Sequence, residues 1–169
     1  MSDNLKDQLI RLGEEQPDLR DHLVPIISHL SRSVESRTLE ISDSAEVASS
    51  ADVRDHASVF GRAKVYQNAE VFDDAWVYGH AEVYGNAKVY GQAEVLGQAH
   101  VRGDAQVYEN AKVMGNALVR KNAVIRGDAK VTGRAMINDD AEIIGGTWDG
   151  SEGEILKGTW KAPGVLADN

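Results

Sequence analysis

The chain contains no cysteine, which excludes disulfide bonds, thiolate metal sites and a cysteine nucleophile. Large aromatic residues are also few, with two phenylalanines and three tryptophans among 169 residues. The longest apolar run near the N-terminus, residues 23–27, is too short for a signal-peptide core or a membrane span. These absences predict a soluble protein that is not secreted by a signal peptide and has no membrane partner.

Basic residues are outnumbered, with 18 Lys and Arg against 27 Asp and Glu and a net charge of −9. An acidic surface repels the phosphates of nucleic acids and of anionic lipids. We therefore expect no nucleic-acid partner. The length suits one domain with at most a small appendage.

An aliphatic residue recurs at every sixth position from Ile41 to Ile143, which gives 18 hexads without an insertion. Alanine stands four positions after each of them, from Ala45 to Ala141, and Thr147 takes that place in the last hexad. Ten hexads carry glycine two positions after the aliphatic residue, often followed by Asn or Asp. A repeat of this regularity predicts a fold made from one short unit.

The spacing within the hexad indicates a parallel coil of short strands. Alanine and the next aliphatic residue are two positions apart, so both point to the same side of a strand. Gly and Asn tolerate positive φ and turn the chain after each strand. A hexad is too short for a hairpin, so we expect each strand to pair with its equivalent in the next coil.

This pattern resembles the hexapeptide-repeat left-handed parallel β-helix family, the trimeric hexapeptide-transferase-like superfamily. The resemblance covers residues 41–148 and implies three hexads per three-sided coil. We therefore expect an all-β fold, a left-handed parallel β-helix of six to seven coils preceded by a short α-helical segment. The expected parts are a helical segment over 1–38, the β-helix over 39–148, and a degenerate last coil with a tail over 149–169.

A coil of three hexads aligns the outward side chains in columns. The third side of the coil carries the longest apolar column, which contains Phe60, Tyr78, Leu96 and Met114, with Trp76 in the neighbouring column. A contiguous apolar stripe usually marks an interface, and the family commonly assembles as parallel trimers. We expect a homotrimer with parallel axes that uses this column or the N-terminal helices. The alternative for the column is that its aromatic rings merely stabilise the stacked coils.

The repeat is degenerate beyond its eighteenth hexad. The hexad register places Trp148 outward and leaves Asp149 and Lys161 at core positions. Residues 146–148 and 158–160 both read Gly-Thr-Trp. We expect a degenerate seventh coil that closes the helix, because exposed strand edges invite aggregation.

Residues 1–38 carry apolar residues at helical spacing, which predicts two or three short amphipathic helices. The apolar positions are Leu5, Leu9, Leu12, Leu19, Leu23, Ile26, Ile27 and Leu30. Such helices bury too little surface to fold alone, so they dock on the first coil, on sister subunits or on another protein. Residues 9–27 resemble an N-terminal segment of some tailed-phage virion proteins. That resemblance implies that residues 1–38 attach the protein to another protein surface, such as a capsid. We expect the protein to lie in the virion if a phage encodes it, and otherwise in the cytoplasm.

Two enzyme classes share the expected coil. Hexapeptide acyltransferases use a histidine as general base with an acyl-thioester donor, and usually carry a loop excursion that shapes the pocket. No excursion interrupts the 18 hexads. Gamma-class carbonic anhydrases hold zinc with three histidines, and the coil contains His56, His80 and His100, whose neighbours do not match that motif.

Two acidic corners, Asp73–Asp74 and Asp139–Asp140, offer oxygen ligands for weak calcium binding, but solvated turns explain them better. We assign no catalytic, cofactor or metal residue. The leading hypothesis is a non-catalytic structural protein, a trimeric virion decoration or fibre-like component. The alternatives are an acyltransferase with a site between subunits, and a surface that binds glycans through the rings of Phe72, Tyr90 and Tyr108.

Overall fold

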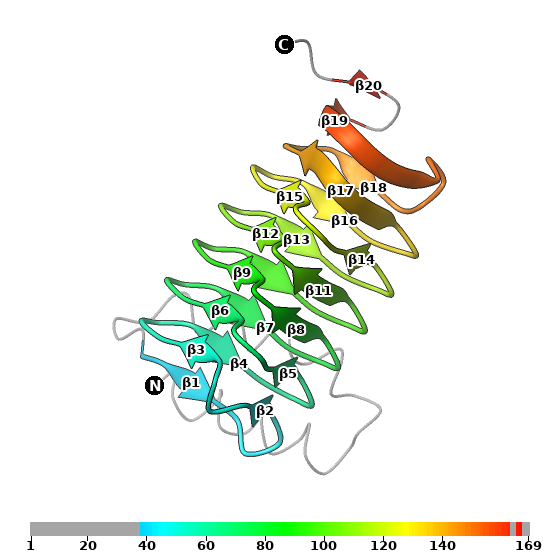
Figure 1. The fold of residues 1–169 in the computed structure, drawn as a ribbon. Coiled ribbons are helices and arrows are strands. Elements are labelled where there is room, and N and C mark those ends of the chain that lie inside the picture. The colour runs from blue at the N-terminus through cyan, green and yellow to red at the C-terminus, as the bar shows by residue number, and fades with distance from the viewer. Residues whose placement is uncertain (1–37, 163–164, 167–169) are drawn as a thin grey trace, which may run out of the picture. The chain divides into compact units, whose positions relative to one another are not determined.

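The computed structural model describes residues 38–162 and 165–166, which form an all-β parallel solenoid of about seven turns (Figure 1). Three strands make each turn, and each strand pairs in parallel with its equivalent in the next coil. Within this part of the chain, no helix has the length and apolar character needed to span a membrane. The expected parallel β-helix is confirmed, and the expected N-terminal helices lie outside the described residues.

The strands line three faces. The first face contains β2 (Glu46–Val47), β5 (Lys64–Val65), β8 (Glu82–Gly85), β11 (His100–Gly103), β14 (Leu118–Val119) and the start of β17 (Met136–Ile143). The second face contains β3 (Asp52–Val53), β6 (Glu70–Val71), β9 (Lys88–Val89), β12 (Gln106–Val107), β15 (Val124–Ile125) and the end of β17. The third face contains β1 (Glu40–Ile41), β4 (Ser58–Val59), β7 (Trp76–Val77), β10 (Glu94–Val95), β13 (Lys112–Val113), β16 (Lys130–Val131) and β18 (Thr147–Trp148).

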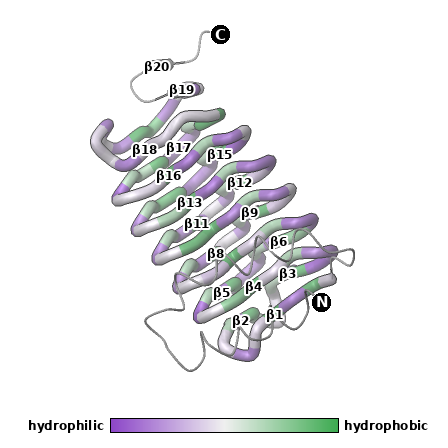
Figure 2. The backbone as a smooth tube through the Cα atoms, turned by 180° about the vertical axis from the view of Figure 1, so that it is seen from behind, coloured by the Kyte–Doolittle hydropathy of each residue, from purple (hydrophilic) through white to green (hydrophobic). Residues whose placement is uncertain are grey.

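The core is a continuous stack of valine, isoleucine and alanine. From Ala57 to Ile143 every inward residue of the repeat is at most 1% exposed. The hydropathy of the residues along the chain accordingly alternates in a pattern that recurs from coil to coil (Figure 2). The first coil departs from this expectation, because Val47 and Val53 are half-buried and Ile41 is 45% exposed. Among the described strands β1 pairs with β4 alone, so one edge of this coil has no stacked neighbour there.

Short corners join the strands and keep the coil length constant. From Val53 to Ile137, the second residue after each inward aliphatic adopts the left-handed conformation, as at Gly85 with φ of 81°. Six non-glycine residues take the same conformation, with φ between 49° and 61°: Asp55, Gln67, Asp73, Glu109, Lys121 and Asp139. The repeat therefore depends on the turn geometry more than on glycine itself.

The last coil contradicts the expected register. Val131 pairs with Trp148 instead of Asp149, so Trp148 occupies the inward position and is fully buried. Thr147, expected in the core, is exposed, and Gly146 takes the place of the alanine. A corner one residue shorter places an indole in the core, where the longer register would bury the carboxylate of Asp149 at a high free-energy cost.

A second tryptophan repeats this arrangement in β19 (Glu154–Ala162). Trp160 packs against the core while Lys161, also expected inside, is exposed. The rings of Trp148 and Trp160 meet edge to face with centroids 5.7 Å apart. Each indole Nε1–H donates to the carbonyl three residues earlier, Gly145 O at 2.7 Å and Lys157 O at 3.0 Å. The echoed Gly-Thr-Trp segments thus close the core, and β20 (Val165–Leu166) pairs antiparallel with β19.

Candidate functional site

The third-face column is the apolar column expected to form an interface: Phe60, Trp76, Tyr78, Leu96 and Met114. Its members lie on successive coils, and the rings of Phe60 and Trp76 are 5.5 Å apart at 47°. Trp76 and Tyr78 are 7% and 5% exposed, whereas Phe60, Leu96 and Met114 are half-buried. The apolar surface that solvent reaches in this column therefore comes mainly from Phe60, Leu96 and Met114.

A carboxylate lies beside this column and is almost completely buried. Glu94 is 7% exposed. Lys112 Nζ lies 3.0 Å from Glu94 Oε1, and the Tyr78 hydroxyl is 3.4 Å from Oε2. A buried carboxylate is costly without such partners. The contacts with Lys112 and Tyr78 therefore offset the cost of burying Glu94 on the third face.

The second-face ladder consists of Phe72, Tyr90 and Tyr108. Neighbouring rings stack with centroids 4.9 and 4.8 Å apart and planes within 2° and 7° of parallel. The Arg54 guanidinium lies 4.1 Å from the Phe72 ring centroid, a favourable cation–π contact. Burial raises the pKa of Tyr90 and of Tyr108. Because neighbouring rings cover one another's faces, they stabilise the stacked coils.

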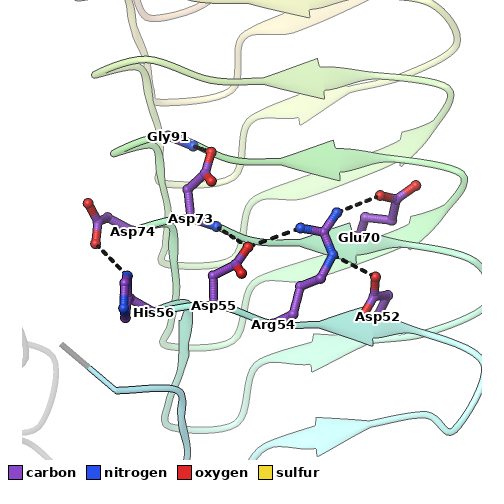
Figure 3. A network of polar contacts seen from close by, with 8 residues as sticks. All are labelled: Asp52, Arg54, Asp55, His56, Glu70, Asp73, Asp74 and Gly91. Atoms are coloured by element: carbon purple, nitrogen blue, oxygen red, sulfur yellow. Dashed lines mark hydrogen bonds and ion pairs between the residues drawn. The ribbon is translucent and has the colours of Figure 1, made fainter.

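Arg54 also joins a polar network at the start of this ladder (Figure 3). Its guanidinium donates to Asp52 at 2.9 Å, to Asp55 at 3.0 Å and to Glu70 of the next coil at 3.3 Å. The hydrogen bond to Asp52 is the main cause that raises the pKa of Arg54. With 42% of the Arg54 side chain exposed, water screens these ion pairs, and their main effect is to orient the arginine.

The corner at Asp73–Asp74, considered above for calcium, bonds to neighbouring coils. Asp73 Oδ2 accepts a hydrogen bond from the Gly91 N–H at 3.1 Å, and Asp74 Oδ1 lies 3.7 Å from His56 Nδ1 (Figure 3). The Asp73 carboxylate thus stabilises the left-handed corner of the coil above it. This use needs no bound ion.

The corner at Asp139–Asp140 is used in the same way. Asp139 forms an ion pair with Lys121 of the coil below, and Asp140 Oδ1 accepts a hydrogen bond from Asn122 Nδ2 at 2.9 Å. Both partners occupy the equivalent corner of the preceding coil. The acidic corners are therefore links in the ladders that stack the coils.

The histidines of the coil lie apart on different columns. His100 Nδ1 is 3.6 Å from Glu82 Oε2, which also accepts a hydrogen bond from the Tyr66 hydroxyl at 2.9 Å. Burial, with this hydrogen bond, raises the pKa of Tyr66. His56 contacts Asp74, and His80 stands at another corner. In the described part of the chain, no three His, Asp or Glu side chains form a group suited to a metal ion.

Two hollows lie near the start of the first face. One of about 370 Å³ is lined by Ser44, Glu46, Arg62, Lys64, His80 and Glu82. The other, of about 620 Å³, is lined by Ala45, Glu46, Val47, Ala48, Lys64, Tyr66 and Glu82. Lys64 Nζ is 3.0 Å from Glu46 Oε2, so these two charged lining groups pair with each other.

The expected attachment residues, Leu5 to Leu30, all lie outside the described residues. Their role stays a prediction from the sequence. No protein-family model matches the chain, and no curated protein sequence is significantly similar to it. The functional argument therefore depends on the geometry of the coil itself.

Proposed function

We propose that the protein is a non-catalytic structural component, a trimeric virion decoration or fibre-like protein attached through residues 1–38. The observation that carries this proposal is the constancy of the corners between Ile41 and Ile143. Enclosed ligand pockets need walls, and no corner in this range extends into a loop that supplies one. The left-handed coil and membership of the hexapeptide family belong to the same proposal.

The outward ladders support a stiff rod. Lysine and glutamate at equivalent positions of neighbouring coils form ion pairs on all three faces: Lys64–Glu46, Lys88–Glu70 and Lys112–Glu94, at 3.0, 2.7 and 3.0 Å. Each pair contributes at most about 1 kcal/mol, but the backbone hydrogen bonds between coils continue along the whole solenoid. A column of this kind resists bending and suits a projecting part.

The proposed trimer uses the exposed part of the third-face column. Replacing Leu96 and Met114 together by Asp places two charges in the interface, and we expect the trimer to dissociate. Sedimentation velocity measures the mass of the parent and of this variant. Val124→Asp is the matched control, because Val124 is a half-buried outward residue of the second face. A monomeric parent, or a trimer that survives the double substitution, contradicts this interface.

The proposed attachment is tested by co-sedimentation of the protein with the virion particle to which it is proposed to attach. Leu23→Asp combined with Ile27→Asp should abolish co-sedimentation, because both changes fall in the apolar stripe of residues 1–38. Ser33→Asp in the same segment is the matched control. Circular dichroism checks that the coil remains folded. Attachment that persists in the double variant removes residues 1–38 from the proposal.

One contact favours a second candidate, the acyltransferase. The Glu82 carboxylate lies beside the His100 imidazole, with Oε2 3.6 Å from Nδ1, an arrangement in which a carboxylate orients a histidine base. Turnover of an acyl thioester that disappears in His100→Gln and persists in His56→Gln would replace the structural proposal. We expect no turnover of an acyl thioester by the parent, by His100→Gln or by His56→Gln.

A further inference from the structure

A diagonal hydrogen bond repeats over the surface of the coil. The side chain that follows an inward aliphatic residue donates to an oxygen of the residue 16 positions later, one coil up. Six such pairs have distances between 2.6 and 3.4 Å: Arg54–Glu70, Tyr66–Glu82, Tyr78–Glu94, Tyr90–Gln106, Arg126–Glu142 and Asn138–Glu154. In each of these six pairs the later residue supplies a carboxylate or amide oxygen.

Two arginines of the first face lack this acceptor. The residue 16 positions after Arg102 is Leu118, and the residue 16 positions after Arg120 is Met136. Arg120 instead donates to Glu154, 34 positions later, at 2.9 Å. Over residues 38–162 and 165–166, the Arg102 side chain has no hydrogen bond or ion pair, and its guanidinium lies 6.0 Å from the Tyr84 ring centroid.

These guanidinium groups are partly removed from water. The Nε atoms of Arg102 and Arg120 are both buried without a hydrogen-bond partner. A buried polar atom of a charged group costs free energy until a partner satisfies it. Arg102 and Arg120 also lie one coil apart in the same column and repel each other. Glu154 already pairs with Arg120, so an anion beside Arg102 relieves both the repulsion and the unsatisfied hydrogen bond there.

Apolar side chains occupy two neighbouring first-face columns: Leu118 and Met136 in one, and Leu156, two coils above Arg120, in the other, which also contains the arginines. Met136 and Leu156 are 40% and 45% exposed, two of the most exposed large apolar residues in the described chain, and Leu118 is half-buried. We call Arg102, Leu118, Arg120, Met136 and Leu156 the arginine–leucine patch. It combines the positive charge of Arg102, with which no described residue forms an ion pair, with exposed apolar area, on a chain whose net charge is −9.

We propose that the arginine–leucine patch is a docking site for a segment of a partner protein that presents a carboxylate beside an apolar side chain. The carboxylate takes the acceptor position that Leu118 leaves empty above Arg102. The apolar side chain covers Leu118 and Met136. This site uses no residue of the third-face column or of residues 1–38, so its failure leaves the proposed structural function standing.

The chemistry of the patch favours such a segment over two other occupants. An inorganic anion satisfies the arginines but leaves Met136 and Leu156 exposed to water. Within the part of the chain that the structure describes, a second copy offers outward glutamates such as Glu70, Glu82 and Glu142, which already accept hydrogen bonds within their own coils. A partner that supplies both groups fits charge and hydrophobicity together.

The test uses the full chain and a short peptide probe, acetyl-Leu-Glu-Leu-amide. The arginine Nε–H signals are followed by nuclear magnetic resonance as the peptide is added. We expect a saturable shift of the Arg102 and Arg120 signals, with an affinity at least about tenfold higher than that of acetyl-Leu-Gln-Leu-amide, because hydrogen bonds between charged groups are the stronger ones. Equal affinities, or no saturable shift, overturn the proposal.

Leu118→Glu supplies the missing acceptor from within the chain. We expect it to shift the Arg102 signal without peptide and to weaken peptide binding at least about tenfold. Val124→Glu is the matched control, because it adds the same charge at the diagonal position above Tyr108 on the second face and should leave binding unchanged. Peptide binding that survives Leu118→Glu overturns the proposal. So does a response to inorganic phosphate as strong as that to the peptide, or self-association that only Leu118→Glu abolishes.

Discussion

Trp148→Ala tests the closing of the solenoid most directly. Trp148 is fully buried, packs edge to face on Trp160, and donates its indole N–H to Gly145 O at 2.7 Å. The adjacent Thr147 is exposed. An unshifted hexad register would instead bury Thr147 and expose Trp148. Comparing Trp148→Ala with Thr147→Ala therefore discriminates between the two registers.

The expected loss follows from the buried area. A buried aromatic side chain removes about 150–250 Å² from water, which at about 25 cal/mol per Å² corresponds to roughly 4–6 kcal/mol as an upper bound. Allowing for partial burial in the unfolded chain, we expect Trp148→Ala to cost about 3–5 kcal/mol, the range typical of this substitution. Thr147→Ala should change stability by about 0.5 kcal/mol or less.

Hydrogen exchange is the appropriate assay, because an end coil of a solenoid can open without the rest. The Thr132 N–H donates to Trp148 O at 2.7 Å and reports on this coil. A loss of about 3 kcal/mol or more accelerates its exchange at least about a hundredfold. If Trp148→Ala accelerates exchange no more than Thr147→Ala does, the buried position of Trp148 is wrong.

Two further substitutions test the core and its charges. Ala87→Leu overfills the narrow interior, where Ala87 is fully buried, and should cost about 1–3 kcal/mol by thermal unfolding; Lys130→Leu, at an exposed outward position, should not. The hydrogen bond from Arg126 lowers the pKa of Glu142 from its usual 4.5, so ionised Glu142 stabilises the fold above that value and loses this effect as pH falls through the lowered pKa. Glu142→Gln should therefore lower the urea midpoint at pH 7, and the difference from the parent should shrink below pH 4.5; a difference independent of pH contradicts this.

The coil was predictable because each position of the hexad has its own residue type. Val89 and Ala87 repeat the inward pair of every other hexad, and no insertion disturbs the spacing from Ile41 onward. The register of the last coil was not found from spacing, because Trp148 replaces the aliphatic residue and shifts by one position. Two features of the sequence did indicate the shifted register. The unshifted register would bury the carboxylate of Asp149, and the Gly-Thr-Trp segment of residues 146–148 recurs at residues 158–160.

The candidate surfaces were predictable in direction but not in exposure. The period of the coil places Trp76 and Tyr78 outward, yet both are buried, because a column position defines where a side chain points and not how much water reaches it. The diagonal hydrogen bond between coils was missed for a related reason. It depends on how far a side chain such as Arg54 or Tyr66 reaches towards the next coil, which the period of the backbone does not contain.

Two irregularities in this surface have opposite consequences. At the short corner before Trp148 the missing residue is compensated within the chain, since the indole fills the core and its N–H binds a carbonyl. At Arg102 the missing acceptor is not compensated by any described residue, and the neighbouring Leu118 lies where the oxygen belongs. A compensated break closes the fold, whereas an uncompensated one leaves a charge that a second molecule can satisfy. For this reason we propose that a partner protein binds the solenoid on its first face, at Arg102.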